Sequence, residues 1–348
     1  MQYLWTRRGG MIATLGLAAL MAAPAAASVR RIIAVGDLHG DFAAWRDIAR
    51  AAGVVDTDGN WAGKDTVLVQ TGDAVDRGPD SRKIVEELMR LQHEAQFAGG
   101  QLISLVGNHE AMNVTGDFRY VSAADYAAYA DRESGYRRAV IYDTNQKAIA
   151  EAYHHRNPAM SGDQIKQAWL AATPLGSIEH QLAWAPKGAI GRWVVNNPAV
   201  ALVDGTLFVH GGISPAYAHM PLDEINRQVS AALLVRSTDP KSIINDPLGP
   251  LWYRGLAAPN GEGGAPDDTA PPEPPVADQL TALLSDFGAQ RIVIGHTPNL
   301  SGIVISDGGR LARIDTGISN VYGGRLSYLE IANGTPTAHT AERSSPKP

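Results

Sequence analysis

The stretch RIIAVGDLHG, residues 31–40, decides the fold, because an apolar run ends there in a glycine-flanked aspartate and histidine. Residues 31–35 have the β-branched composition of a strand, and a helical pattern follows at 42–52. The same succession continues along the chain, with further strands predicted at 66–70 and 101–106. Strands and helices that alternate at this spacing predict βαβ units and a mostly parallel sheet.

Later apolar runs predict strands at residues 199–203, 206–209, 290–294, 301–305, 311–314 and 326–331. Three stretches differ from this pattern. Residues 118–193 are rich in tyrosine and alanine and predict a helical insertion over one side of the core. Residues 257–276 are dense in proline, glycine and acidic residues and predict a mobile loop. The polar segment 332–348 predicts a frayed tail.

The composition is that of a globular protein of 348 residues, 45% hydrophobic and 19% charged, with a formal net charge of −6. The chain is long enough to bury a large core. Its mildly acidic balance argues against non-specific nucleic-acid binding, which needs a basic surface. The chain has no cysteine, which excludes disulfides, thiolate metal ligands and cysteine nucleophiles.

The N-terminus predicts a signal peptide over residues 1–27. Arg7 and Arg8 precede the short apolar stretch 11–21, and small residues at 22–28 offer an A-x-A cleavage pattern. The apolar stretch is too short to span a bilayer comfortably, so we expect no stable membrane anchor after cleavage. This predicts a periplasmic or secreted protein, exported by either the Sec or the twin-arginine route.

Five short polar motifs each follow an apolar strand. They are GDLHG (36–40), GDAVDRG (72–78), GNHE (107–110), HGG (210–212) and GH (295–296). The carboxyl ends of strands in a parallel α/β sheet meet at one crevice, so these loops can form one pocket. The motifs bring together aspartate, asparagine and histidine, which are donors suited to Mn, Fe or Zn. The set is too large for one tetrahedral ion, and a carboxylate can bridge two ions about 3.5–4 Å apart.

The order of these motifs resembles the catalytic core of the calcineurin-like metallophosphoesterases. The Asp-Arg-Gly ending of the second motif and the glutamate of GNHE resemble the phosphoprotein-phosphatase branch, nearest the bacterial Shewanella-like phosphatases. The resemblance implies an α/β fold, a sandwich of two mixed β-sheets flanked by helices, with its catalytic domain at 29–331. The chain departs from eukaryotic Ser/Thr phosphatases at Asp41, where they commonly carry glutamine, and this leaves the substrate open.

The resemblance also implies a role for each motif residue. Two divalent or trivalent transition metal ions would be held by Asp37 and His39 on one side, by Asn108, His210 and His296 on the other, and by Asp73 between them. His109 would act as general acid, with Asp76 keeping its ring protonated. Arg77 would clamp the substrate phosphate in a bidentate fork, with Arg254 as a second clamp. Apart from the resemblance, Tyr322 is a candidate hydroxyl donor at the site.

These roles imply a metal-dependent phosphatase that hydrolyses phosphate monoesters by direct attack of a metal-bound hydroxide, without a phosphoenzyme. We expect a phosphoprotein phosphatase, for tyrosine or serine/threonine, and the sequence leaves open whether the physiological substrate is a phosphoprotein or a small phosphate ester. One alternative is a dinucleoside polyphosphate hydrolase, since related hydrolases share these motifs. Another is an inactive, metal-stabilised phosphate-binding module, against which the intact pair of His109 and Asp76 argues. The oligomeric state stays open.

Both ends of the 118–193 insertion adjoin motif loops, which makes it a candidate lid that selects substrates. Its tyrosines, among them Tyr120, Tyr126, Tyr129 and Tyr136, are candidates for an aromatic wall beside the pocket. The alternative is that they pack the insertion onto the core. The pair His154–His155 lacks nearby aspartate partners and predicts a solvated helix face.

Overall fold

The computed structural model describes residues 30–257 and 274–344 of the chain. The predicted signal peptide and most of the predicted 257–276 loop lie outside the described residues. Within the described ranges, no helix is both long and apolar enough to cross a membrane.

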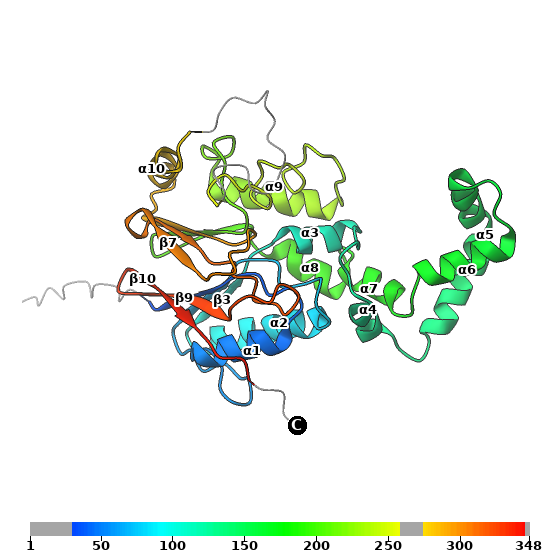
Figure 1. Ribbon diagram of the computed structural model, residues 1–348, viewed down its shortest axis with the longest axis horizontal. Helices are drawn as coiled ribbons and strands as arrows, with labels where there is room; N and C mark the ends of the chain where they lie inside the picture. Colours follow the sequence, from blue (N-terminus) through cyan, green and yellow to red (C-terminus); the bar gives the residue numbers. More distant parts are fainter. Residues whose placement is uncertain (1–29, 258–273, 345–348) are drawn as a thin grey trace, which may run out of the picture.

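Two five-stranded mixed sheets face each other (Figure 1). The first has the order β10-β9-β1-β2-β3 and is made of β10 (Thr335–Thr340), β9 (Ser327–Ala332), β1 (Ile32–Val35), β2 (Val67–Gln70) and β3 (Gln101–Ser104). The second has the order β4-β5-β6-β8-β7 and is made of β4 (Val200–Val203), β5 (Thr206–Val209), β6 (Arg291–Ile294), β8 (Leu311–Arg313) and β7 (Val304–Ser306). Strands β1, β2 and β3 run parallel, as do β5, β6 and β8. The predicted α/β sandwich of two mixed sheets is confirmed.

Both faces of the central strands are buried, which explains why their sequences are nearly all apolar. On β1, Ile32 and Ala34 pack into the space between the sheets, where they join Phe208 and Val293 of the second sheet. Ile33 and Val35, which point to the opposite face of β1, lie in the larger apolar cluster beneath the helices.

Helices cover the two outer faces of the sandwich (Figure 1). On the side of the first sheet are α1 (Phe42–Ala51) and α2 (Ser81–Phe97). On the side of the second are α9 (Leu222–Leu234) and α10 (Val276–Asp286), which the sequence reasoning did not identify. The short helix α3 (Asn108–Thr115) begins inside the GNHE motif.

The insertion is helical and divides into two parts. Its helices are α4 (Ala123–Tyr129), α5 (Ser134–Arg156), α6 (Gly162–Ala172), α7 (Ser177–Trp184) and α8 (Ala189–Asn196). Trp184 and Val194 belong to the main core, so α7 and α8 pack on the catalytic body. Helices α5 and α6 instead extend away from both sheets (Figure 1), and α5 buries only Ser134 and Tyr142. His154 and His155 are exposed on α5.

The prediction of a frayed tail at 332–348 is wrong for its first half. Residues 335–340 form β10, which pairs with β9 along its full length. The reversal is made by Asn333 and Gly334, whose φ angles of 50° and 76° are both positive. An Asn-Gly pair is the preferred sequence of a tight hairpin turn, because both residues tolerate the left-handed conformation. This signal was present in the sequence and outweighs the polar composition.

Candidate metal centre and active site

The five motif loops meet at the carboxyl ends of β1, β2, β3, β5 and β6. Several of their residues have the left-handed backbone conformation that side-chain-bearing residues rarely adopt, with φ of 41° at His39, 53° at Asp73 and 66° at His296. Such strain gathers at functional sites, where the surrounding structure holds it in place. The loops also pack backbone to backbone: a Cβ on Gly107 would lie 2.4 Å from the backbone nitrogen of Asp73. Glycine at this position therefore allows the second and third motifs to touch.

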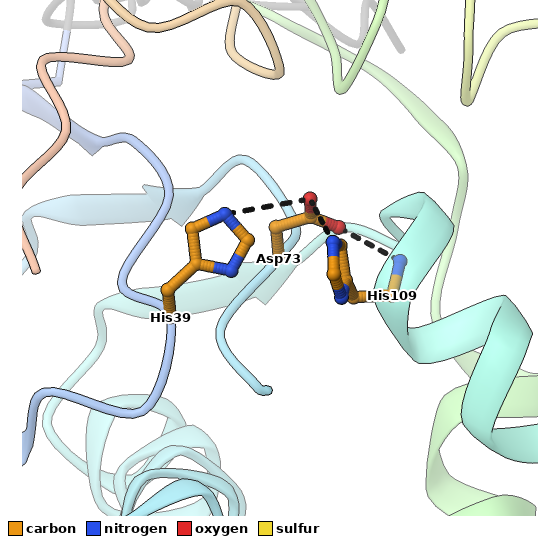
Figure 2. Close-up of side chains that lie close together, drawn as sticks. All are labelled: His39, Asp73 and His109. Atoms are coloured by element: carbon orange, nitrogen blue, oxygen red, sulfur yellow. Dashed lines mark hydrogen bonds and ion pairs between the residues drawn. The ribbon is translucent and has the colours of Figure 1, made fainter. Parts of the chain in front are cut away.

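Asp73 lies at the middle of the site. Its Oδ2 atom is 3.9 Å from His39 Nε2 and 3.8 Å from His109 Nε2 (Figure 2). The Oδ1 atom accepts a hydrogen bond from the backbone N–H of His109 at 2.9 Å. Asp37 adds a second carboxylate, with Oδ2 4.0 Å from His39 Nε2. Asp73 and Asp37 are both buried, so their oxygens face the side chains of the site rather than bulk water.

A second group of donors lies on the other side of Asp73. His210 Nε2 is 3.4 Å from Asp73 Oδ2, 2.9 Å from Asn108 Oδ1 and 3.1 Å from His296 Nδ1. Donor atoms of His39, Asp73 and His109 lie within 4.8 Å of one another, and so do donor atoms of Asp73, His210 and His296, so the donors on each side are close enough together for an ion. The two groups share Asp73, which is the arrangement expected for a bridging carboxylate.

Backbone carbonyls fix the imidazole tautomers. His39 Nδ1 lies 3.1 Å from Val75 O, and His210 Nδ1 lies 2.9 Å from Thr71 O. A ring that donates its Nδ1–H to a carbonyl presents the Nε2 lone pair to the site, as metal-ligating histidines do. His296 Nε2 is buried and has no hydrogen-bond partner among the described residues. These donor atoms therefore fit cations.

The charges of the site also suit cations. Burial, Asp315 and Asp73 together raise the pKa of Asp37 well above its usual range, because several carboxylates share one small volume. Burial lowers the pKa of His210, but the Asp73 carboxylate opposes this and the net shift is upward. A bound cation would relieve the repulsion between these carboxylates.

His109 forms a charge-assisted pair with Asp76. The Nδ1 atom of the ring is 2.7 Å from Asp76 Oδ2, and Asn113 Nδ2 donates to Asp76 Oδ1 at 2.9 Å. Burial lowers the pKa of His109, whereas Asp73 and Asp76 raise it, and the net shift is upward. The pair leaves His109 Nε2 as the atom that faces the site.

Arg77 lies beside His109, with Nη2 3.5 Å from His109 Nε2. Its guanidinium carbon is 4.6 Å from the ring centre of Tyr120 and 5.4 Å from that of Tyr322. The backbone N–H of Arg77 donates to Tyr120 O at 2.9 Å. Two aromatic rings thus lie against the guanidinium.

Arg254 lies beside His296. Its Nη1 atom donates to His296 O at 3.2 Å and to Thr297 Oγ1 at 2.9 Å. The structure therefore brings every predicted site residue into one region, with Arg77 next to His109 and Arg254 next to His296.

Sequence reasoning gave no role to two buried carboxylates of the site. Glu110 accepts the backbone N–H groups of Asp73 and Gly107 through Oε2, each at 2.8 Å, and that of Ala74 through Oε1 at 2.9 Å. Burial and the Asp73 charge raise the pKa of Glu110 to about 7, although the hydrogen bonds from the amides of Asp73 and Gly107 act to lower it. Glu110 thus ties the second motif to the third, and its place in GNHE was the available signal.

Asp315 is the other carboxylate. It directly follows the predicted strand 311–314, so the same rule that found the five motifs could have found it. Its Oδ1 atom accepts the backbone N–H of Gly317 at 2.9 Å. Burial raises the pKa of Asp315 to about 6.

Of the four tyrosines considered for an aromatic wall, one lies at the site. Tyr120 packs with its ring centre 4.9 Å from that of His109. Tyr126 and Tyr129 instead surround His180 in the insertion, with ring centres 5.3 and 4.9 Å from it. Tyr136 is 74% exposed on α5. The aromatic wall therefore comes from Tyr120 and Tyr322, which approach Arg77 from different segments.

Known proteins resemble this chain in sequence and in fold. The family model described as calcineurin-like phosphoesterase matches residues 30–300. The chain is 32% identical to an uncharacterized protein of Schizosaccharomyces pombe, over 86% of this chain and 77% of that protein. It is 30% identical to Shewanella-like protein phosphatase 2 of Arabidopsis thaliana, over 83% of this chain and 71% of that protein. The solved structure of a cold-active protein-tyrosine phosphatase of a psychrophilic Shewanella species has the same fold, with a TM-score of 0.63 and 22% identity over 90% of this chain and 81% of that one.

Proposed function

The chain belongs to the calcineurin-like phosphoesterase family, in its Shewanella-like phosphatase branch, and we propose that it removes phosphate from phosphorylated proteins with two bound metal ions. The observation that carries this proposal is the position of Asp73 between His39 on one side and His210 and His296 on the other, with the His109–Asp76 pair beside them. Membership of this family shows that the chain is a metal-dependent phosphatase. Manganese, iron and zinc all fit the mixture of carboxylate, amide and imidazole donors.

Asp37 and His39 would hold one ion, Asn108, His210 and His296 the other, and Asp73 both. When bound, the ions supply a nucleophile from water and neutralise charge on the phosphoryl oxygens. The remaining work falls to side chains that are not ligands, which bind the phosphate and move one proton.

His109 would be the general acid. Its Nδ1–H donates to Asp76, so the proton on Nε2 faces the space between Asp73 and Arg77. As the ester P–O bond breaks, this proton passes to the leaving oxygen, which departs as a neutral hydroxyl. A pure phosphate-binding module would have no use for such a proton donor.

Arg77 and Arg254 would hold the phosphate from two sides. The planar fork of Arg77 suits two phosphate oxygens at once, and the flanking rings limit its rotamers. Since Tyr120 and Tyr322 present aromatic surface at this clamp, we propose a preference for phosphotyrosine over phosphoserine. One relative is named a protein phosphatase and a protein of the same fold is a protein-tyrosine phosphatase, which supports this choice.

Four substrates test the proposal: p-nitrophenyl phosphate, a phosphotyrosine peptide, the matching phosphoserine peptide and diadenosine tetraphosphate. We expect the highest kcat/KM on the phosphotyrosine peptide. Faster hydrolysis of diadenosine tetraphosphate would instead assign the chain to the dinucleoside polyphosphate hydrolases. Tight phosphate binding without turnover of any substrate would identify a binding module.

Export to the periplasm or the medium is also part of the proposal, on the basis of residues 1–27. Protein isolated from the native host should begin near Ser28. N-terminal sequencing that found Met1 intact in the cytoplasmic fraction would refute it.

A further inference from the structure

The C-terminal segment continues past its hairpin to the first motif loop. After β10, the backbone N–H of Ala341 donates to Leu326 O at 2.9 Å. On the other side of Arg343, the backbone N–H of Ser344 donates to Asp47 Oδ2 on α1 at 2.7 Å. These contacts hold Arg343 between them, with its side chain one-third exposed at 33%.

Arg343 contacts two separate segments of the site's supporting structure. Its Nη1 atom is 3.1 Å from Asp41 Oδ2, and Nη2 donates to Ile318 O. Asp41 is buried at the end of GDLHG, where Oδ1 accepts the N–H of Ala44 at the start of α1 and Oδ2 accepts the N–H of Asn320, both at 2.9 Å. The guanidinium therefore provides the positive partner of a buried carboxylate that joins the first motif to the 318–320 loop.

The two joined segments carry residues of the site. Ser319 Oγ donates to His39 O at 3.2 Å, which ties the 318–320 loop directly to a predicted metal ligand. The same loop leads to Tyr322, whose ring centre is 5.3 Å from that of His39. Removing the guanidinium would leave the buried Asp41 charge without a cationic partner, at a cost that the loops can reduce only by moving.

We propose that Arg343 is a positioning residue of the metal centre, which holds the His39 half of the site through Asp41 and the 318–320 loop. The inference rests on the proposed two-metal site. Residues that hydrogen-bond a metal ligand directly change metal affinity by about 10–100-fold when they are substituted, and Arg343, which acts through Asp41 and the 318–320 loop, should have an effect at the lower end of that range. The His210–His296 half is braced by other contacts, among them that of His210 Nδ1 with Thr71 O. The effect should therefore fall on one ion of the two.

The test compares Arg343→Gln with Arg310→Gln. Arg310 is a matched control, because it donates to Asp307 O and Thr281 Oγ1 on the surface, outside the motif loops. Metal-stripped proteins would be titrated with Mn²⁺ by calorimetry, and the metal kept after gel filtration would be counted by elemental analysis. We expect wild type and Arg310→Gln to keep two ions, and Arg343→Gln to keep one and to bind the other at least about tenfold more weakly.

Arg343→Lys provides a second variant, because lysine keeps the charge beside Asp41 but lacks the fork that also reaches Ile318 O. We expect it to bind the weaker ion with an affinity between those of wild type and the glutamine variant. Two ions bound with wild-type affinity in either Arg343 variant would overturn the proposal, even if the melting temperature fell, since that result marks a structural role alone. Because the readout is metal binding, absence of phosphatase activity in the wild type would refute the proposed function without altering this comparison.

Discussion

His109 Nδ1 lies 2.7 Å from Asp76 Oδ2, a contact that joins the third motif to the second. It fixes the ring so that Nε2 faces Asp73 and Arg77. The pair therefore separates the proton donor of the site from its ligands, and this separation can be tested.

His109→Asn should keep the fold and the metals while kcat falls by about 10²–10⁴, because only the proton donor is lost. The decrease should be larger for phenyl phosphate than for p-nitrophenyl phosphate, whose leaving group needs no proton. Elemental analysis beside the kinetics provides the control. Loss of an ion along with activity would make His109 a ligand instead.

Asp73→Asn should lose both ions together, because Asp73 is the residue that the two donor groups share. The measurement is metal content after gel filtration, with Asp58→Asn, a change at an exposed residue, as the control. Retention of two tightly bound ions in Asp73→Asn would exclude a bridging role.

Arg77→Lys should raise KM for aryl phosphates by roughly tenfold or more, since an ammonium group cannot make the bidentate contact and charged hydrogen bonds contribute about 1.5–3 kcal/mol. Arg82→Lys is the matched control, because Arg82 also lies over a tyrosine ring, that of Tyr129, but on α2 and outside the motifs. An unchanged KM in Arg77→Lys would show that Arg77 does not bind the substrate phosphate through a bidentate contact.

The stability of the insertion should fall in acid because of His180. This ring is buried among Phe118, Tyr126, Tyr129 and Trp184, and burial lowers its pKa from the ordinary value of 6.5 to about 4. The folded state therefore favours the neutral ring, so its full stability is present above pH 6.5 and is lost as the pH falls toward 4. At 1.36 kcal/mol per pKa unit, the loss reaches about 3 kcal/mol.

Urea unfolding of metal-stripped protein at pH 7 and pH 4.5 measures this loss. His180→Phe has no titrating group, so its stability should depend less on pH than that of wild type. His155→Gln, at an exposed residue, should behave as wild type does. Equal pH dependence in wild type and His180→Phe would show that other groups are responsible.

The sequence predicted the buried strands and the helices between them because those signals are local, whereas the division into two mixed sheets was implied by the family resemblance of the motifs. Apolar runs such as residues 31–35 and 66–70 are nearly continuous where strands are buried on both faces, and they are separated by helical patterns. Element bounds were less accurate: the strand expected at 301–305 is β7 at Val304–Ser306. The 335–340 strand was missed because its polar composition was given more weight than the Asn-Gly turn before it.

The sequence by itself determined which donors come together at the site, because each motif follows a strand and the carboxyl ends of parallel strands meet. Only the tertiary structure decided how the donors are held. Glu110 bracing the second motif, Tyr120 and Tyr322 flanking Arg77, and Arg343 paired with Asp41 from 302 residues away are contacts between segments that have no fixed spacing in the chain. Such contacts depend on how loops pack after the sheets have formed, and although the GNHE motif marks Glu110, no local pattern of residues says which segment each of these side chains will meet.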